Sequence, residues 1–229
     1  MKKIYVLIIC TFIFLGAEAQ NISKVKLSGS GEIESIAFDI GESVIVNISK
    51  EGSLLSWGVD NYLGSRTENY QDKYLEYTGK TSNYNETDNE AFKGRIKSIG
   101  ATYITYYASF EDEMLRGKIK SIGRINFEYF PSFEYQPYKG YLKKIGDNQI
   151  SWYGSYDNAA YAGKLKSLGL TSFTYYASYD DKLIRGKIKS IGGNNFSYYS
   201  SIDRPEYRGG FKTGNPVSFV NGIKYFITN

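Results

Sequence analysis

A glycine recurs at a fixed interval of 23 residues through the second half of the chain, at positions 94, 117, 140, 163, 186 and 209. Nothing is inserted or deleted between copies, so "GKIKSIG" at 117–123 returns unchanged at 186–192. With this glycine as position 0, position 3 is always lysine, and position 6 is glycine until Asn215 replaces it in the last copy. A strict period of this length predicts one small structural unit stacked against copies of itself.

Each unit is predicted to contain two short strands. "GKIKSI" alternates between apolar and polar residues, and "FTYYAS" is β-branched and aromatic. The glycine between them suits a tight turn that needs a positive φ. No window has the sustained 3.6-residue apolar period of a helix. We therefore predict an all-β antiparallel meander of 23-residue hairpins that is strongly twisted, curled or partly closed, because a flat meander would leave its aromatic face in water.

Alternation along the strands divides each unit into two faces. We assign positions 2 and 4 of the first strand, and positions 10, 12 and 14 of the second, to the inner face. Position 3 and the aromatic residue at position 13 then face outward. The isoleucine at position 5, such as Ile122, falls on the lysine face unless a bulge turns it inward.

The outer face is the candidate binding surface, because tyrosine rings can stack on sugars and lysines can meet anionic or carbonyl-rich groups. A solvated charged face is the ordinary alternative. The candidate ligand-binding residues are Lys120, Lys143, Lys166, Lys189, Tyr153, Tyr176 and Tyr199.

The N-terminus has the features of a secretory signal peptide. Lys2 and Lys3 precede an apolar run over 4–15, and "AEA" ends at Ala19. We expect residues 1–19 to be removed, with the rest secreted, periplasmic or at the cell surface and without a transmembrane span. Loss of two lysines and one glutamate lowers the net charge from +4 to +3, too little to indicate a nucleic-acid partner.

The remainder divides into three parts by its agreement with the period. Residues 20–60 are interpreted as degenerate N-terminal hairpin repeats, and 61–92 as an irregular insertion that is either a specific site or a capping excursion. Residues 93–229 hold the regular repeats and a C-terminal closing strand. Trp57 and Trp152 are expected to be core residues or, alternatively, ligand platforms.

Two repeat classes resemble this pattern. The segment "YDDKLIRGKIKSIGGNNFSYYSSID" at 179–203 is similar to the YD repeats of bacterial surface and toxin-shell proteins, although Phe110-Glu111 and Phe133-Glu134 depart from the Tyr-Asp pair. The Tyr-x-Gly at 138–140 and 161–163 resembles MORN repeats, whose second Gly-x-Gly is missing. The nearest likeness is to uncharacterised exported repeat proteins of Bacteroidota. These resemblances imply a β-meander and no particular activity.

Few catalytic chemistries remain open to the chain. It has no histidine, and its single cysteine, Cys10, lies in the predicted leader, which excludes Ser-His-Asp, Cys-His and histidine-ligated metal sites. A carboxylate pair for glycoside hydrolysis remains possible. The candidate acids are Glu111, Asp112, Glu113, Asp180 and Asp181.

These acids have a simpler interpretation, because the acidic residues at position 17 form a repeat column. A column of this kind is typical of side chains that hydrogen-bond their own loop. Their spacing also differs from that of a calcium loop. We therefore expect no metal and no cofactor.

The sequence predicts an exported, non-enzymatic binding or scaffold module for a surface glycan or a surface protein. The alternative is a carboxylate-dependent glycan-processing enzyme, or a glycan-binding protein that uses the Tyr/Lys face.

Overall fold

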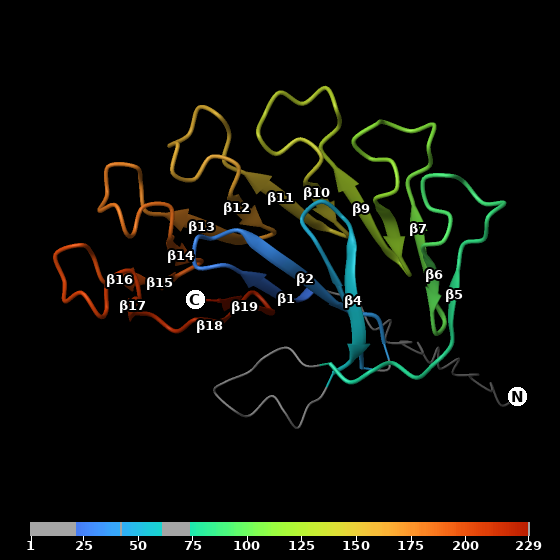
Figure 1. The fold of residues 1–229 in the computed structure, drawn as a ribbon, viewed down its shortest axis with the longest axis horizontal. Helices are drawn as coiled ribbons and strands as arrows, with labels where there is room; N and C mark the ends of the chain where they lie inside the picture. Colours follow the sequence, from blue (N-terminus) through green and yellow to red (C-terminus); the bar gives the residue numbers. More distant parts are fainter. Residues whose placement is uncertain (1–21, 42, 61–73, 229) are drawn as a thin grey trace, which may run out of the picture.

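The computed structural model describes residues 22–41, 43–60 and 74–228, which fold into two large β-sheets and a separate two-stranded pair (Figure 1). The predicted leader with Cys10, and residues 61–73 of the predicted insertion, lie outside the described residues. Within the described ranges all regular structure is strand. No helix there is long and apolar enough to cross a membrane.

The smaller sheet, called the inner sheet below, joins the two ends of the chain. It has six strands in the order β18-β19-β1-β2-β3-β4, and β1 and β19 run parallel. The strands are β1 (Ile22–Leu27), β2 (Ile33–Asp39), β3 (Val44–Ile48), β4 (Leu54–Val59), β18 (Val217–Val220) and β19 (Ile223–Ile227).

The larger sheet, called the array below, is an antiparallel meander of eleven strands in sequence order from β5 to β15. The short pair β16 and β17 follows it. The strands are β5 (Thr81–Asn83), β6 (Ile96–Ile99), β7 (Thr102–Tyr106), β8 (Ile119–Ile122), β9 (Ile125–Tyr129), β10 (Leu142–Ile145), β11 (Asn148–Trp152), β12 (Leu165–Leu168), β13 (Thr171–Tyr175), β14 (Ile188–Ile191), β15 (Asn194–Asn195), β16 (Ser197–Tyr198) and β17 (Phe211–Thr213).

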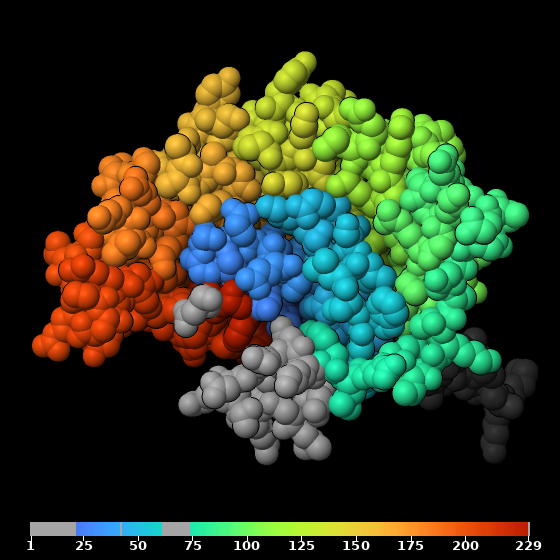
Figure 2. Space-filling view, in the orientation of Figure 1, coloured from blue at the N-terminus to red at the C-terminus, as the bar shows by residue number. Residues whose placement is uncertain are grey.

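The array curls around the inner sheet, which fills the hollow of the arc (Figure 2). One hydrophobic core joins the two sheets. Phe38 of the inner sheet meets Phe127 edge-on at 5.4 Å between ring centroids, and Tyr225 meets Phe173 at 5.5 Å. The predicted all-β, curled meander is confirmed, and a second sheet covers its aromatic face.

A bulge in the first strand of the unit places both isoleucines in the core. Ile104 pairs with Ile122 and Thr105 with Ser121, but Tyr106 pairs with Ile119, so Lys120 is skipped. Positions 2 and 5 are both buried as a result. The bulge is confirmed, whereas the inward serine at position 4 is wrong. Ser121 instead meets Thr105 on the outer face at 2.6 Å.

The structure also changes the predicted division of the chain. Residues 22–59 form two hairpins that lie in the inner sheet instead of extending the array. The predicted closing strand, β19, joins β1. The array begins at Thr81 instead of residue 93, because β5 pairs with β6 and the Tyr84 hydroxyl donates to the Ile104 carbonyl.

Two similar turns attach the inner sheet to the array. The turns at 28–32 and 49–53 have matching backbone hydrogen bonds, and each places a glycine with positive φ at the same position. A Cβ on Gly31 would lie 2.4 Å from the Tyr175 ring, and one on Gly52 would lie 2.0 Å from the Tyr129 hydroxyl. Only glycine therefore fits at either tip.

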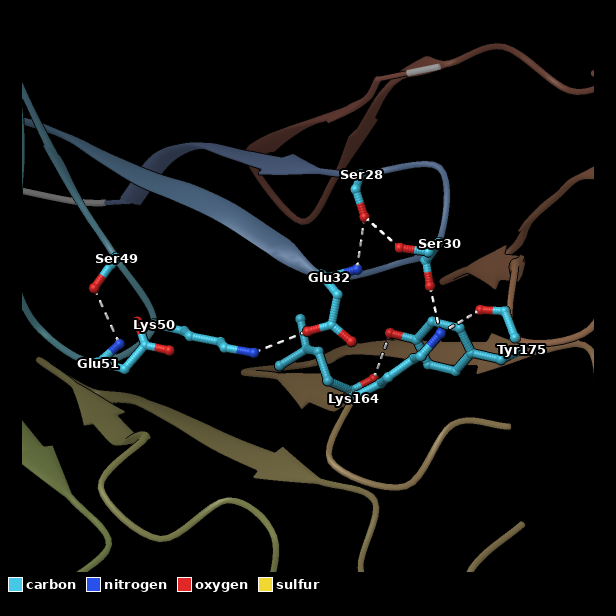
Figure 3. A network of polar contacts seen from close by, with 10 residues as sticks. Ser28, Ser30, Glu32, Ser49, Lys50, Glu51, Lys164 and Tyr175 are labelled. Atoms are coloured by element: carbon cyan, nitrogen blue, oxygen red, sulfur yellow. Dashed lines mark hydrogen bonds and ion pairs between the residues drawn. The ribbon is translucent and has the colours of Figure 1, made fainter. Parts of the chain in front are cut away.

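Lysines complete this attachment (Figure 3). Lys164 donates to the carbonyls of Ser30 and Gly186, so it links a turn of the inner sheet to two units of the array. Lys118 does the same with Glu51 and Gly140. Burial lowers the pKa of both lysines. Lys50 pairs with Glu32 at 2.8 Å and so joins the two turns of the inner sheet to each other. Lys118 and Lys164 thus add polar contacts to the packing that holds the two sheets together.

Candidate functional site

The predicted lysines and aromatic residues come together as stacked pairs on the outer face. Each lysine at position 3 lies over the position-13 ring of the preceding unit, with Nζ between 5.0 and 5.9 Å from the ring centroid. The pairs are Lys97 with Tyr84, Lys120 with Tyr107, Lys143 with Phe130, Lys166 with Tyr153, Lys189 with Tyr176, and Lys212 with Tyr199. These distances are those of cation–π contacts.

The tyrosines of these pairs also connect neighbouring units. The Tyr153 hydroxyl donates to the Phe173 carbonyl at 2.9 Å, and Tyr176 donates to Phe196 at 3.0 Å. Both rings are half-buried, and desolvation raises the pKa of each phenol. Their polar atoms are already used inside the protein, so these tyrosines brace the array and present little free surface.

The contribution of these hydrogen bonds to stability can be tested by comparing two nearby tyrosines, Tyr176 and Tyr179. Tyr176→Phe is expected to lower the free energy of unfolding by about 1 kcal/mol, because it removes one intramolecular hydrogen bond. The control, Tyr179→Phe, changes an 87% exposed ring and is expected to have almost no effect. Urea denaturation of the two variants measures the difference, and equal losses would show that the Tyr176 bond contributes nothing.

On the outer face, side-chain hydroxyls of neighbouring strands hydrogen-bond to each other in most units. They join position 11 of one unit to position 4 of the next, at 2.6–2.7 Å between oxygens. The pairs are Ser82 with Ser98, Thr105 with Ser121, Ser151 with Ser167, Thr174 with Ser190, and Ser197 with Thr213. Between β9 and β10, Glu128 and Lys144 stand at these two positions and form an ion pair at 4.0 Å. These cross-strand pairs of the outer face are therefore all polar.

The acids at position 17 organise the long loops that connect the units. The Glu111 carboxylate accepts from the Ala108 amide, and Asp180 accepts from Ala177, each at 2.5 Å. Burial raises the pKa of Glu111, but the Ala108 amide and Lys120 outweigh it and lower the pKa overall. The prediction that these acids bond their own loops is confirmed for both.

Residues at position 18 join several of the loops to the next one. The Asp112 carboxylate accepts from the Ser132 hydroxyl at 2.7 Å, and Asp181 accepts from Ser201 in the same way. These serines hold the pKa of both carboxyls below its usual range. Four of the five candidate catalytic acids therefore serve in structural bonds of separate loops.

The sequence analysis missed a row of apolar side chains at position 16, here called the loop ridge. Its members are Phe110, Phe133, Tyr156, Tyr179 and Ile202, which are 84%, 75%, 98%, 87% and 92% exposed. Each occupies the same place in its loop, directly before the acid at position 17. The signal was present in the sequence, because a large apolar residue precedes the acid in five successive units.

Both tryptophans belong to the hydrophobic core or pack against it. Trp152 is a core residue, 5% exposed, whose indole N–H donates to the Leu142 carbonyl at 2.7 Å. Trp57 is half-buried and packs against the same core.

In the described part of the chain, no three acidic side chains are grouped closely enough to hold a metal ion.

Comparisons with protein-family models, curated proteins and solved structures gave no match.

Proposed function

We propose that the protein is an exported, non-enzymatic scaffold whose loop ridge binds an extended polysaccharide outside the cell. The observation that supports this proposal is the loop ridge, in which each of five successive loops holds a large apolar side chain almost entirely in solvent. A single exposed apolar side chain needs no explanation, but the same place in five successive loops gives a regular row that a repeating ligand can contact.

The loops that carry the ridge are held rigidly. Acids such as Asp157 and Asp180 bond their own loops, and bonds such as Asn158 to Ser178 connect successive loops. A binding surface that is ordered before the ligand arrives loses little conformational entropy on binding. The exposed rings are therefore better explained as prepared contacts than as mobile loop tips.

The arrangement of the loops favours a flexible linear ligand. The loops fan outward around the arc in Figure 1, and Figure 2 shows them as separate projections along its rim. A flat membrane or a rigid protein surface would reach only some of the tips at once. A polymer chain can follow the rim and meet them all.

The chemistry of the ridge favours a polysaccharide over other polymers. Aromatic rings can stack on the apolar faces of sugars, and the outer face beside them is lined with hydroxyls and lysines. Adjacent units are two strands, at least ~10 Å, apart, so successive rings would meet every second or third sugar. A net charge of only +3 after leader removal provides little attraction for nucleic acid.

The predicted lysines have a secondary place in this proposal. Lys120 contacts both the Tyr107 ring and the Glu111 carboxylate, so the lysine stripe lies directly beside the loops. Lys143, Lys166 and Lys189 are expected to hydrogen-bond sugar hydroxyls or carboxylates at the edge of the bound chain. The geometry favours this binding role over the carboxylate-dependent enzyme, because four of the five candidate acids are engaged in hydrogen bonds that hold the loops.

Affinity electrophoresis in gels containing soluble polysaccharides tests the proposal. A neutral β-glucan, a xylan and a polyuronate sample the main chemistries. The native protein is expected to be retarded by at least one of them. Tyr156→Ala combined with Tyr179→Ala should remove most of that retardation, because it interrupts the ridge at two adjacent loops.

The matched control is Leu170→Ala, which removes a side chain that is 92% exposed but lies on a tight turn at the other edge of the array. It should leave retardation unchanged. Retardation that survives the tyrosine pair, or no retardation in any of the three gels, would contradict the proposal.

A further inference from the structure

In the last unit of the array, the two strands on either side of the tight turn do not pair with each other in the described structure. In the preceding unit the two strands pair, with Ser190 opposite Asn195 and Ile191 opposite Asn194. The equivalent strands β17 and β18 are not joined by a ladder in the described structure. β17 pairs with β16, and β18 pairs with β19 in the inner sheet. The turn here has Asn215 in place of glycine, followed by Pro216, which cannot donate to a ladder.

This opening moves an aromatic residue from the core to the surface. Phe219 occupies position 10 of its unit and is 71% exposed. The equivalent residues of the other units are all at most 4% exposed. They are Ile104, Phe127, Ile150, Phe173 and Phe196. The chain thus exposes a ring at the one unit whose turn is opened.

A groove of about 460 Å³ lies here, between β15 with the turn before it and the segment that runs from Gly214 into β18. Phe219, Asn194, Asn195 and Asn215 are among the residues that line it. None of the eight described residues that line the groove carries a charge. The Asn215 carbonyl accepts from the Val217 amide at 2.9 Å, which orients that side chain.

We infer that this groove binds one or two rings of a neutral saccharide. An exposed aromatic ring offers a platform for the apolar face of a sugar, and three amides can each donate to and accept from its hydroxyls. The size lies within the range of small-ligand sites. The lining residues carry no counter-charge for a charged ligand. Lys224 lies next to the platform, with its Nζ 5.9 Å from the Phe219 ring centroid, and can donate to a sugar hydroxyl.

An inserted peptide strand is the competing occupant, because β18 is the edge strand of the inner sheet. Several backbone groups at its start are already used, however. Pro216 has no N–H and its carbonyl accepts from Ile227, while the Val217 N–H is held by Asn215. The start of this edge is therefore not available for strand addition, and we favour the saccharide.

The groove and the loop ridge are separate sites. The groove lies at the tight-turn edge of the array, whereas the ridge lies on the long loops, and consecutive antiparallel strands place these at opposite edges. The inference does not depend on the ridge, and a variant of one site should leave the other intact.

Titration of ¹⁵N-labelled protein followed by amide NMR tests the inference. The probes are cellobiose, N,N′-diacetylchitobiose, glucuronic acid and a synthetic peptide of residues 171–176. At least one of the neutral disaccharides is expected to give saturable shifts at Asn194, Asn195 and Phe219. Phe219→Ala should weaken its binding about tenfold or more, and Asn195→Ala should weaken it to a smaller degree.

Both substitutions change exposed side chains, so the variants should fold normally. Tyr156→Ala with Tyr179→Ala serves as a second control and should leave the groove shifts unchanged. The inference is overturned if the neutral disaccharides shift no groove amide, if Phe219→Ala binds as the native protein does, or if only glucuronic acid or the peptide binds there.

Discussion

Gly52→Ala is expected to lower the free energy of unfolding by about 2–5 kcal/mol. The residue has φ +81°, where an added side chain costs about 1–2 kcal/mol. The new Cβ would also lie 2.0 Å from the Tyr129 hydroxyl, and overpacking of this kind costs about 1–3 kcal/mol. The ring cannot easily move, because Tyr129 is buried and donates to the Ile119 carbonyl at 2.7 Å.

Gly222→Ala provides a matched control. Gly222 has φ +80°, but no described atom lies within 4 Å of the position that an alanine Cβ would occupy there. In this variant the free energy of unfolding should fall only by the cost of placing a side chain at positive φ, about 1–2 kcal/mol. Chemical denaturation of both variants isolates the contact between turn and array. Equal losses would show that the Gly52 tip does not pack against Tyr129 as described.

Alkaline unfolding is the second large effect expected. Burial raises the pKa of Tyr106 and Tyr225 to about 12, and raises those of Tyr129 and Tyr175 well above the usual value. In the unfolded chain these phenols ionise near pH 10. Between about pH 10 and 12 the unfolded state therefore loses protons that the folded state retains, and stability falls as pH rises.

The size of this effect follows from the shifts. Each pKa unit corresponds to about 1.4 kcal/mol, so Tyr106 and Tyr225 together remove about 5 kcal/mol by pH 12. That is comparable with the whole stability of many domains, about 5–15 kcal/mol. Denaturant titrations at a series of alkaline pH values should show a steep decline that starts near pH 10.

Replacing Tyr129 and Tyr175 by phenylalanine tests the cause of that decline. The double variant loses two hydrogen bonds, to the Ile119 and Leu165 carbonyls, and should be less stable at neutral pH. Its stability should nevertheless fall less steeply above pH 10, because two titrating groups are gone. An unchanged slope would assign the alkaline effect to other groups.

The sequence predicted the repeating frame because that frame is local. The 23-residue period, the two strands, the bulge that brings Ile122 inward and the loop-capping acids all depend on residues within one or two units. The inner sheet was not predictable in the same way. β1 and β19 are paired although about 200 residues separate them, and their strand patterns do not specify a partner.

The candidate site was predicted only in part, for a related reason. Alternation correctly placed Lys166 and Tyr153 together, but it could not show that the Tyr153 hydroxyl is used by the next unit. Exposure of the loop ridge depends on how loops project from a curved array, which the strand pattern does not encode. The exposed Phe219 depends on the opened last unit, for which Asn215 and Pro216 gave only a local sign.

Binding along successive loops is the central claim, and the length dependence of the affinity tests it most directly. Calorimetric titration would use a ladder of oligosaccharides from whichever polysaccharide retards the protein. The affinity is expected to rise with chain length until one chain spans the five loops of the ridge, because each added contact becomes intramolecular. Equal affinities for the shortest and the longest oligosaccharides would contradict the account.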